Sequence, residues 1–215
     1  MPDAGRIEGA VTLAGPVPRL QAREVTKDHV ACGEKAKPNL SLVLGKEKGI
    51  GNAVVHLVGI GTGERFAPAS PSLDQRGCDF VPYIQIVPAG VKVAVLNSDS
   101  VSHNVHGYDA EGTSLFNVGQ PLKGQRVEQE IGAAGAVRLK CDVHPWMFAW
   151  MWVAENPYAV LTGRDGHFIL TDVPAGTYRL GVWHELFGAK EVPVTVPAGG
   201  TARVDLTLSL LDPGS

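Results

Sequence analysis

The sequence predicts an all-β protein built from two β-sandwiches. The chain has 215 residues, of which 44% are hydrophobic and 19% charged, so it can bury a core and is not a disordered composition. Its 26 glycines and 15 prolines separate short runs rich in valine. Such runs recur at intervals of about 8–12 residues, a pattern typical of sandwiches and barrels. No segment carries a convincing helical pattern.

The first part of the chain contains three candidate strands. They cover residues 6–13, 40–44 and 53–58, and each ends at a glycine-containing turn. The polar residues 21–37 show little periodicity and are predicted to form a loop. Residues 61–72 are rich in turn-forming residues and mark the first predicted domain boundary.

The central part alternates more clearly. Val91, Val93 and Val95 lie on one face of a predicted strand, with a lysine on the other. Residues 109–123 are polar and are predicted to form a long loop. The candidate strands of this part cover residues 83–87, 91–96, 103–107, 126–131, 136–141 and 150–153.

The second boundary is predicted at Glu155-Asn156-Pro157, where the composition changes. Asp165-Gly166 and residues 173–177 have turn sequences. The candidate strands beyond the boundary cover residues 167–170, 178–183, 191–196 and 202–208.

The charge distribution disfavours two classes of partner. The formal net charge is −3 with histidine neutral, and no lysine/arginine run stands out. Nucleic acid and anionic membranes are therefore not expected as partners. No apolar stretch approaches the roughly 20 residues that cross a bilayer. The first five residues have no signal-peptide pattern, so we expect either a cytosolic protein or a mature segment that restarts with Met1.

The residue pattern most specific for chemistry is a short loop that carries three soft or borderline donors. Cys141, His144 and Met147 are each separated by two residues, and Pro145 stiffens the turn between them. A thiolate, an imidazole and a thioether suit copper better than magnesium or calcium. An upstream histidine-bearing stretch over residues 97–106 offers a second imidazole. Together they give the His₂Cys set with a weak axial Met of electron-transfer copper sites.

This pattern resembles the type 1 (blue) copper cupredoxins, and most closely the amicyanins. The family carries Cys-x-x-His-Pro-aromatic-Met after a strand and His-Asn-Val-His upstream. Both elements are matched here, and the resemblance extends over about residues 72–153. It implies a Greek-key cupredoxin β-sandwich and one copper ion with the ligands His103, Cys141, His144 and Met147.

The resemblance also assigns roles around these ligands. The backbone N–H of Asn104 matches the group that bonds the cysteine sulfur in the family. His106 is not a ligand by this match. The family resemblance further implies a one-electron carrier rather than an enzyme. Its redox partner, such as a cytochrome or a dehydrogenase, would dock near His144 and Trp146, on an apolar rim shared with Pro145 and Phe148.

Other interpretations remain open from the sequence. Cys141 could be a buried free thiol, or the fold could persist with no copper or another metal. A thiolate-bridged binuclear site lacks its second cysteine in this loop, and a structural zinc site has no use for Met147. An extracytoplasmic binding or scaffold module and a copper-dependent redox enzyme are the alternative functions. A fourth ligand at Met147 disfavours the enzyme, which needs an open position.

Two further cysteines bear on the location of the protein. If Cys141 holds a metal, Cys32 and Cys78 can pair in a disulfide; the alternative is two buried free thiols. Disulfides persist in oxidising compartments. The pairing therefore favours a periplasmic or extracytoplasmic protein.

Residues 163–180 resemble the carboxypeptidase-regulatory, transthyretin-like β-sandwich. They contain its Asp-Gly-x-Phe element followed by Val-Pro-x-Gly-x-Tyr-x-Leu, and its opening strands resemble residues 9–12 and 52–58. We expect one split module over residues 5–62 and 155–210, with a cupredoxin domain at 71–154 inserted. Two consecutive domains are the alternative. Trp183-His184-Glu185 has no third ligand or nucleophile nearby in the sequence and is expected to be structural.

Overall fold

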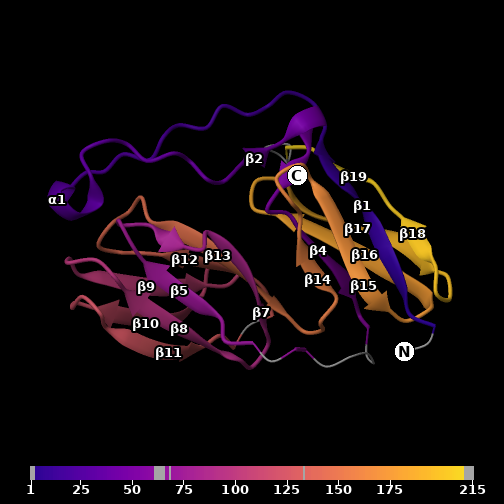
Figure 1. Cartoon of the computed structure of the whole chain (residues 1–215). Coiled ribbons are helices and arrows are strands. Elements are labelled where there is room, and N and C mark those ends of the chain that lie inside the picture. Colours follow the sequence, from indigo (N-terminus) through magenta and orange to yellow (C-terminus); the bar gives the residue numbers. More distant parts are fainter. Residues whose placement is uncertain (1–2, 61–65, 68, 133, 211–215) are drawn as a thin grey trace. The chain divides into compact units, whose positions relative to one another are not determined.

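The chain divides into two compact units, each described here by itself. The structure is a computed structural model that describes residues 3–60, 66–67, 69–132 and 134–210 (Figure 1). The first unit comprises Met1–Leu20, Leu40–Arg65 and Asn156–Ser215, and the second comprises Gln21–Asn39 and Phe66–Glu155.

The first unit is a sandwich of β-sheets. Within the described residues, β1 is flanked by β15 and β18 and also pairs with β19, while the facing sheet has the order β14-β4-β16-β17. A hairpin of β2 and β3 carries the 3₁₀ turn η1 between its strands. The elements are β1 (Gly5–Leu13), β2 (Val43–Leu44), η1 (Lys46–Lys48), β3 (Ile50–Gly51), β4 (Val54–Val58), β14 (Ala159–Leu161), β15 (His167–Val173), β16 (Gly176–His184), β17 (Gly188–Val196), β18 (Thr201–Arg203) and β19 (Leu206–Leu208).

Both sheets of the first unit contribute to one hydrophobic core. Ile7 and Val11 of β1 are fully buried there with Leu180 and Val182 of β16. The strand predicted over residues 202–208 is two short strands instead. The break is explained by Asp205, whose carboxylate oxygen accepts a hydrogen bond from the Ala10 backbone N–H at 2.9 Å and so interrupts regular pairing.

The second unit contains two further sheets. In the part of the chain that the structure describes, their orders are β10-β9-β12-β13-β7 and β11-β8-β5-β6. β13 pairs in parallel with β7, and β8 pairs in parallel with β5. The elements are α1 (His29–Cys32), β5 (Ser72–Gln75), β6 (Phe80–Val81), β7 (Ile84–Pro88), β8 (Lys92–Asn97), β9 (His103–Tyr108), β10 (Ser114–Gln120), β11 (Arg126–Glu130), β12 (Gly135–Lys140) and β13 (Phe148–Ala154).

The two sheets of the second unit pack around a common core. Val93 and Val95 of β8 are buried as predicted, in one cluster with Leu139 of β12 and Met151 of β13. Val91 precedes the strand and is only partly buried. The alternating pattern therefore predicted the strand and its buried face correctly, but it placed the first residue of the strand at Val91 instead of Lys92.

The prediction of a long polar loop over residues 109–123 is wrong. Residues Ser114–Gln120 form β10, which pairs antiparallel with β9 at the edge of the sheet. Most of its side chains are exposed or partly exposed, so the strand lacks the apolar alternation that would reveal it. Backbone hydrogen bonds to β9 hold it instead.

The segment Gln21–Asn39 is mostly irregular, as predicted, apart from the four-residue helix α1. The structure places it in the second unit, whereas the sequence pattern assigned residues 5–62 to the split module. Its anchors are the Cys32–Cys78 disulfide and the ion pairs of Arg23 and Lys37 with Asp79. Residues 61–65, at the start of the predicted first boundary, lie outside the described residues.

Neither α1 nor η1, the helices among the described residues, has the length and apolar character needed to cross a membrane.

Candidate metal centre

Three predicted donor residues converge in the second unit. His103 begins β9, while Cys141 and His144 lie in the loop between β12 and β13. The Cys141 sulfur lies 3.8 Å from Nδ1 of His103 and 3.8 Å from Nδ1 of His144. The two Nδ1 atoms lie 2.9 Å apart. Donors bound to one ion at about 2.0–2.3 Å are separated by about 3–4 Å, so these three atoms fit a single metal ion.

The loop is closed by its own backbone. The Cys141 N–H donates to the Met147 carbonyl at 3.2 Å, and the Met147 N–H donates to the His144 carbonyl at 2.9 Å. Met147, the fourth predicted ligand, is fully buried in the same apolar cluster as Cys141. The short spacing therefore folds the loop back on itself and brings the backbones of Cys141 and Met147 together.

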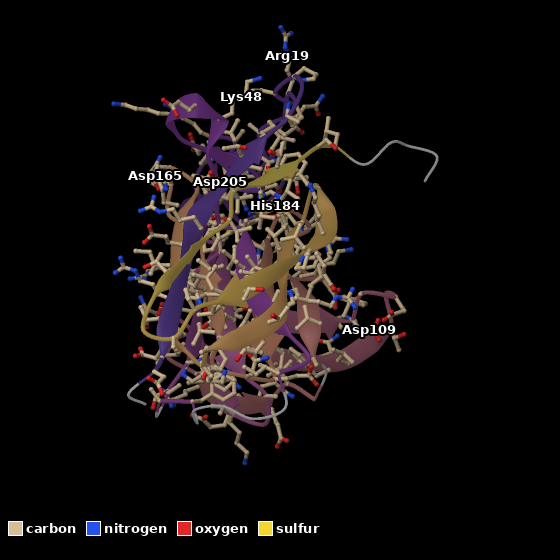
Figure 2. The ribbon with its side chains drawn as sticks, turned by 90° about the vertical axis from the view of Figure 1, so that its right-hand side faces the viewer. Arg19, Lys48, Asp109, Asp165, His184 and Asp205 are labelled. Carbon is tan, nitrogen blue, oxygen red and sulfur yellow. A yellow bond between two sulfur atoms is a disulfide. The ribbon has the colours of Figure 1, made fainter. Side chains whose placement is uncertain are left out.

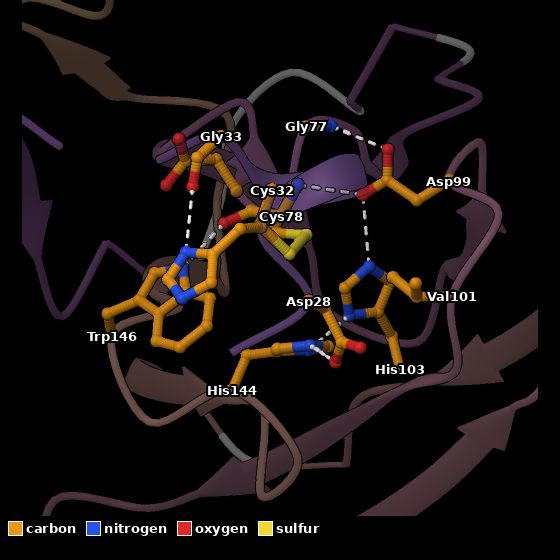
Figure 3. Close-up of a disulfide and its surroundings, with 12 residues drawn as sticks. Asp28, Cys32, Gly33, Gly77, Cys78, Asp99, Val101, His103, His144 and Trp146 are labelled. Carbon is orange, nitrogen blue, oxygen red and sulfur yellow. Dashed lines mark hydrogen bonds and ion pairs between the residues drawn. A yellow bond between two sulfur atoms is a disulfide. The ribbon is translucent and has the colours of Figure 1, made fainter. Parts of the chain in front are cut away.

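The centre is sealed from solvent. The exposed fractions of His103, Cys141, His144 and Met147 are 1%, 2%, 0% and 0%. Trp146, at 5% exposure, packs on His144 with ring centroids 5.0 Å apart, and its indole N–H donates to the Cys78 carbonyl. Of the predicted apolar rim, His144 and Trp146 are therefore buried, whereas Pro145 is exposed and Phe148 is partly exposed. The segment Gln21–Asn39, which the sequence pattern assigned to the other unit, lies against this imidazole (Figure 3).

Each histidine bonds a carboxylate through its other ring nitrogen (Figure 3). Nε2 of His103 lies 2.9 Å from a carboxylate oxygen of Asp99, which also accepts the backbone N–H groups of Gly77 and Cys78. Nε2 of His144 lies 2.9 Å from a carboxylate oxygen of Asp28. Such partners fix the tautomer and orientation of ligating imidazoles and leave Nδ1 free for a metal.

The electrostatics of the three donors are coupled. Burial by itself would lower the pKa of His103, but hydrogen bonds to Asp99 and Cys141 outweigh it and raise the pKa to about 9. Burial opposes ionisation of Cys141, yet the hydrogen bonds from His103 and from the Asn104 backbone N–H lower the thiol pKa. Burial lowers the pKa of His144. The cluster thus favours a thiolate, the form that binds metals.

Asn104 contributes with its side chain as well as its backbone. Its amide oxygen accepts the Asp142 N–H at 2.7 Å, and its amide nitrogen donates to the Asp142 carboxylate at 2.7 Å. These bonds hold the residue after Cys141 against β9. His106 points elsewhere: its ring nitrogens lie 2.9 Å from Asp142 and 2.8 Å from Ser114.

The remaining predictions concern the disulfide and His184. Cys32 and Cys78 form the predicted disulfide, with Cα atoms 5.0 Å apart.

His184 is buried in the first unit at 2% exposure and stacks on Phe187 (Figure 2 labels its position). Its Nδ1 accepts the Leu186 N–H. The contacts are those of a packed core histidine.

The sequence pattern did not identify Asp28 or Asp99 as partners of the site. Asp99 lies four residues before His103 and could have been found as a nearby carboxylate. Asp28 is 116 residues away from His144 and carries no local signal. Only the folded chain brings it to the imidazole.

The chain thus consists of two units built almost entirely of β-strands, and the second unit encloses a buried His-Cys-His cluster. Residues 153–209 match the family model of the carboxypeptidase regulatory-like domain, a range that includes β14 to β19. No curated protein matches the chain.

Several solved copper proteins are similar to part of the chain. The novel purple cupredoxin from Nitrosopumilus maritimus is 27% identical, with 40% of this chain and 100% of that chain covered and a TM-score of 0.35. Amicyanin from Paracoccus versutus is 15% identical, covering 46% and 97% with a TM-score of 0.36. The Cu-containing nitrite reductase from Thermus scotoductus SA-01 is 22% identical, covering 46% and 25% with a TM-score of 0.35.

The match over residues 153–209 agrees with the sequence resemblance of residues 163–180, and the second unit is a pair of β-sheets that carries the His-Cys-His cluster.

Proposed function

We propose that the second unit binds one copper ion in a type 1 site and acts as a one-electron carrier. His103, Cys141 and His144 would hold the ion, with Met147 as a weak axial ligand. The observation that carries the proposal is the approach of two Nδ1 atoms to one buried sulfur, at 3.8 Å each. Two imidazoles and one thiolate with a thioether form the donor set of electron-transfer copper sites.

The rigidity of the site supports a carrier. Bound copper would supply a one-electron couple, and the protein would keep the ligands fixed in both oxidation states. The Asp99 and Asp28 carboxylates hold the two imidazoles, and Asn104 holds the loop through Asp142. Residues held from both sides cannot rearrange readily, which keeps the reorganisation that accompanies electron transfer small.

A copper-dependent redox enzyme is the second candidate, because one structurally similar protein is a Cu-containing nitrite reductase. The burial of all four proposed ligands disfavours it, since a substrate needs an open coordination position. Adding azide or nitrite to the cupric protein discriminates between the two. A carrier keeps its visible spectrum unchanged, whereas an enzyme site shows rapid ligand binding.

We infer a redox protein as the partner, in a weak complex with a small interface. The Cys32–Cys78 disulfide favours an oxidising, extracytoplasmic compartment. The proposed domain organisation is a cupredoxin domain interrupting the carboxypeptidase regulatory-like module, with the segment Gln21–Asn39 joined to the former.

The test is a titration of the metal-free protein with Cu(II). An intense visible thiolate-to-copper band should appear at one equivalent and bleach with a reductant. Cys141→Ala should abolish the band, while His106→Ala, a matched histidine variant outside the donor cluster, should keep it. A colourless protein without bound copper would overturn the proposal, and so would a band that survives Cys141→Ala.

A further inference from the structure

The segment Gln21–Asn39, here called the strap, leaves the first unit and belongs to the second. Its two ends are joined to each other: the backbone N–H groups of Arg23 and Lys37 donate to one another's carbonyls at 2.8 Å. Both side chains then bond the same residue, Asp79, at 2.7 and 3.0 Å. The strap is therefore a closed loop whose base is fixed to the residue after Cys78.

The strap is also fixed to the loop between β12 and β13 that carries Cys141, His144 and Met147. The buried guanidinium of Arg23 donates to the Trp146 carbonyl at 3.0 Å and lies over the Phe148 ring at 5.5 Å. Near its tip, the disulfide joins Cys32 of α1 to Cys78. The sulfur atoms of this disulfide lie within 4.8 Å of a His144 ring nitrogen.

The tip of the strap supplies the outer partner of His144. Asp28 precedes α1 and has a left-handed backbone, with φ 53° and ψ 37°. Its carboxylate makes no cap hydrogen bond to the helix, although aspartate is a preferred helix cap. Instead it lies 2.9 Å from Nε2 of His144, and the imidazole has no exposed surface.

From these contacts we propose that the strap is a closure over the metal centre: Asp28 positions His144, and the Cys32–Cys78 disulfide keeps the strap shut, so that metal ions and small reagents reach His144 only when the strap opens. The proposal rests on the proposed function for the identity of the metal, but the closure itself is a property of the metal-free protein. It makes Asp28 a positioning residue, since its contact with a metal runs through His144.

The closure is tested by carbethoxylation of the metal-free protein with diethylpyrocarbonate, in which an imidazole nitrogen attacks the reagent's carbonyl and ethyl carbonate leaves. Peptide mass spectrometry then reports each histidine separately. In the parent protein, exposed His167 should react and His144 should not. The double variant Cys32→Ser/Cys78→Ser should raise the carbethoxylation rate of His144 about 10-fold or more, because loss of the disulfide increases the population of molecules in which the strap is open.

His184 and an exposed residue of α1 provide two controls. His184 is buried in the other unit and should stay unreactive in every variant. Val30→Ser changes a fully exposed residue of α1 outside the anchors and should leave the rate at His144 as in the parent. An unchanged rate at His144 in a double variant with a native circular dichroism spectrum overturns the closure.

A second pair of variants keeps the disulfide and covers the case in which the double variant does not fold. Asp28→Ala should raise the rate at His144 about 3-fold by freeing local opening, and Asp28→Asn, which retains an acceptor oxygen, should stay near the parent. In copper-loaded protein, Asp28→Ala should also raise the reduction potential, because a negative charge that favours Cu(II) is lost. If neither the carbethoxylation rate of His144 nor the reduction potential changes, Asp28 does not position His144. If no copper binds, the carbethoxylation result still stands, so the two proposals fail separately.

Discussion

Nε2 of His103 lies 2.9 Å from the carboxylate of Asp99, four residues earlier in the chain. That carboxylate is itself held by the Gly77 and Cys78 N–H groups at 2.6 and 2.7 Å. Outer partners of metal-bound histidine typically contribute about 10–100-fold to metal affinity. Asp99→Ala should therefore weaken Cu(II) binding by about that factor, measured by competition with a chromophoric chelator.

The control for this variant is Glu130→Gln, which removes an exposed carboxylate from β11 of the same unit. It should leave the affinity unchanged. Asp99→Asn keeps one acceptor oxygen and should fall between Asp99→Ala and the parent. Equal affinities for Asp99→Ala and Glu130→Gln would show that the carboxylate does not support His103.

Copper should stabilise only the second unit. A ligand that binds the folded state raises its stability by about 2.7 kcal/mol at a concentration 100 times Kd. Differential scanning calorimetry should therefore show one transition moving up with Cu(II) while the other stays in place. The shift should vanish in Cys141→Ala. A uniform shift of both transitions would mean that binding does not reside in the second unit alone.

The first unit should lose stability in acid because of His184. Burial lowers its pKa to about 4, from 6.5. The unfolded chain therefore binds a proton at a higher pH than the folded one. The resulting stability is fully present above about pH 6.5 and is lost as the pH falls through about 4, by about 3 kcal/mol in total.

The measurement is the free energy of unfolding of the first unit between about pH 7 and pH 4, by calorimetry. His184→Asn keeps an acceptor for the Leu186 N–H but does not titrate in this range. It should flatten the pH dependence. An equally steep decline in that variant would assign the acid sensitivity to other groups.

Gly9 of β1 should not tolerate a side chain. An added Cβ would lie 1.8 Å from the Val204 carbonyl oxygen, a backbone atom that cannot turn away. Gly9→Ala should lower the stability of the first unit by about 1–3 kcal/mol or more, as overpacking does. Gly119→Ala in β10, where nothing lies within 4 Å, is the matched control. Comparable melting temperatures for the two variants would contradict the close approach.

Arg23 should matter for the stability of the second unit. Its guanidinium bonds Asp79, the Trp146 carbonyl and the Pro38 carbonyl, and it is 7% exposed. Removing one partner of a fully buried pair costs about 3–5 kcal/mol, and the cost here should be smaller because Asp79 is 26% exposed and keeps its bond to Lys37. Arg23→Ala should lower the free energy of unfolding of the second unit by about 1–3 kcal/mol and move its calorimetric transition to a lower temperature. Arg19→Ala, on an exposed residue of the first unit, should shift neither transition.

Local patterns in the sequence were sufficient for many of the strands and for the donor residues of the loop after β12. Cys141, His144 and Met147 are brought together by a loop of seven residues, because chain connectivity alone keeps closely spaced residues near one another. The strand containing Val93 and Val95 followed from its period of two, because its alternate side chains face the core. β10 was missed because an exposed edge strand is held by backbone bonds rather than by an apolar face.

The surroundings of the site were decided by the tertiary structure. Asp28 and His144 are 116 residues apart, and no local pattern links them. The Cys32–Cys78 disulfide and the ion pairs to Asp79 fix the strap within the second unit, where His144 and Trp146 of the predicted rim are buried. The sequence by itself therefore predicted which donor atoms come together, as those of His103, Cys141 and His144 do. Long-range bonds between distant segments determined how those atoms are oriented and covered.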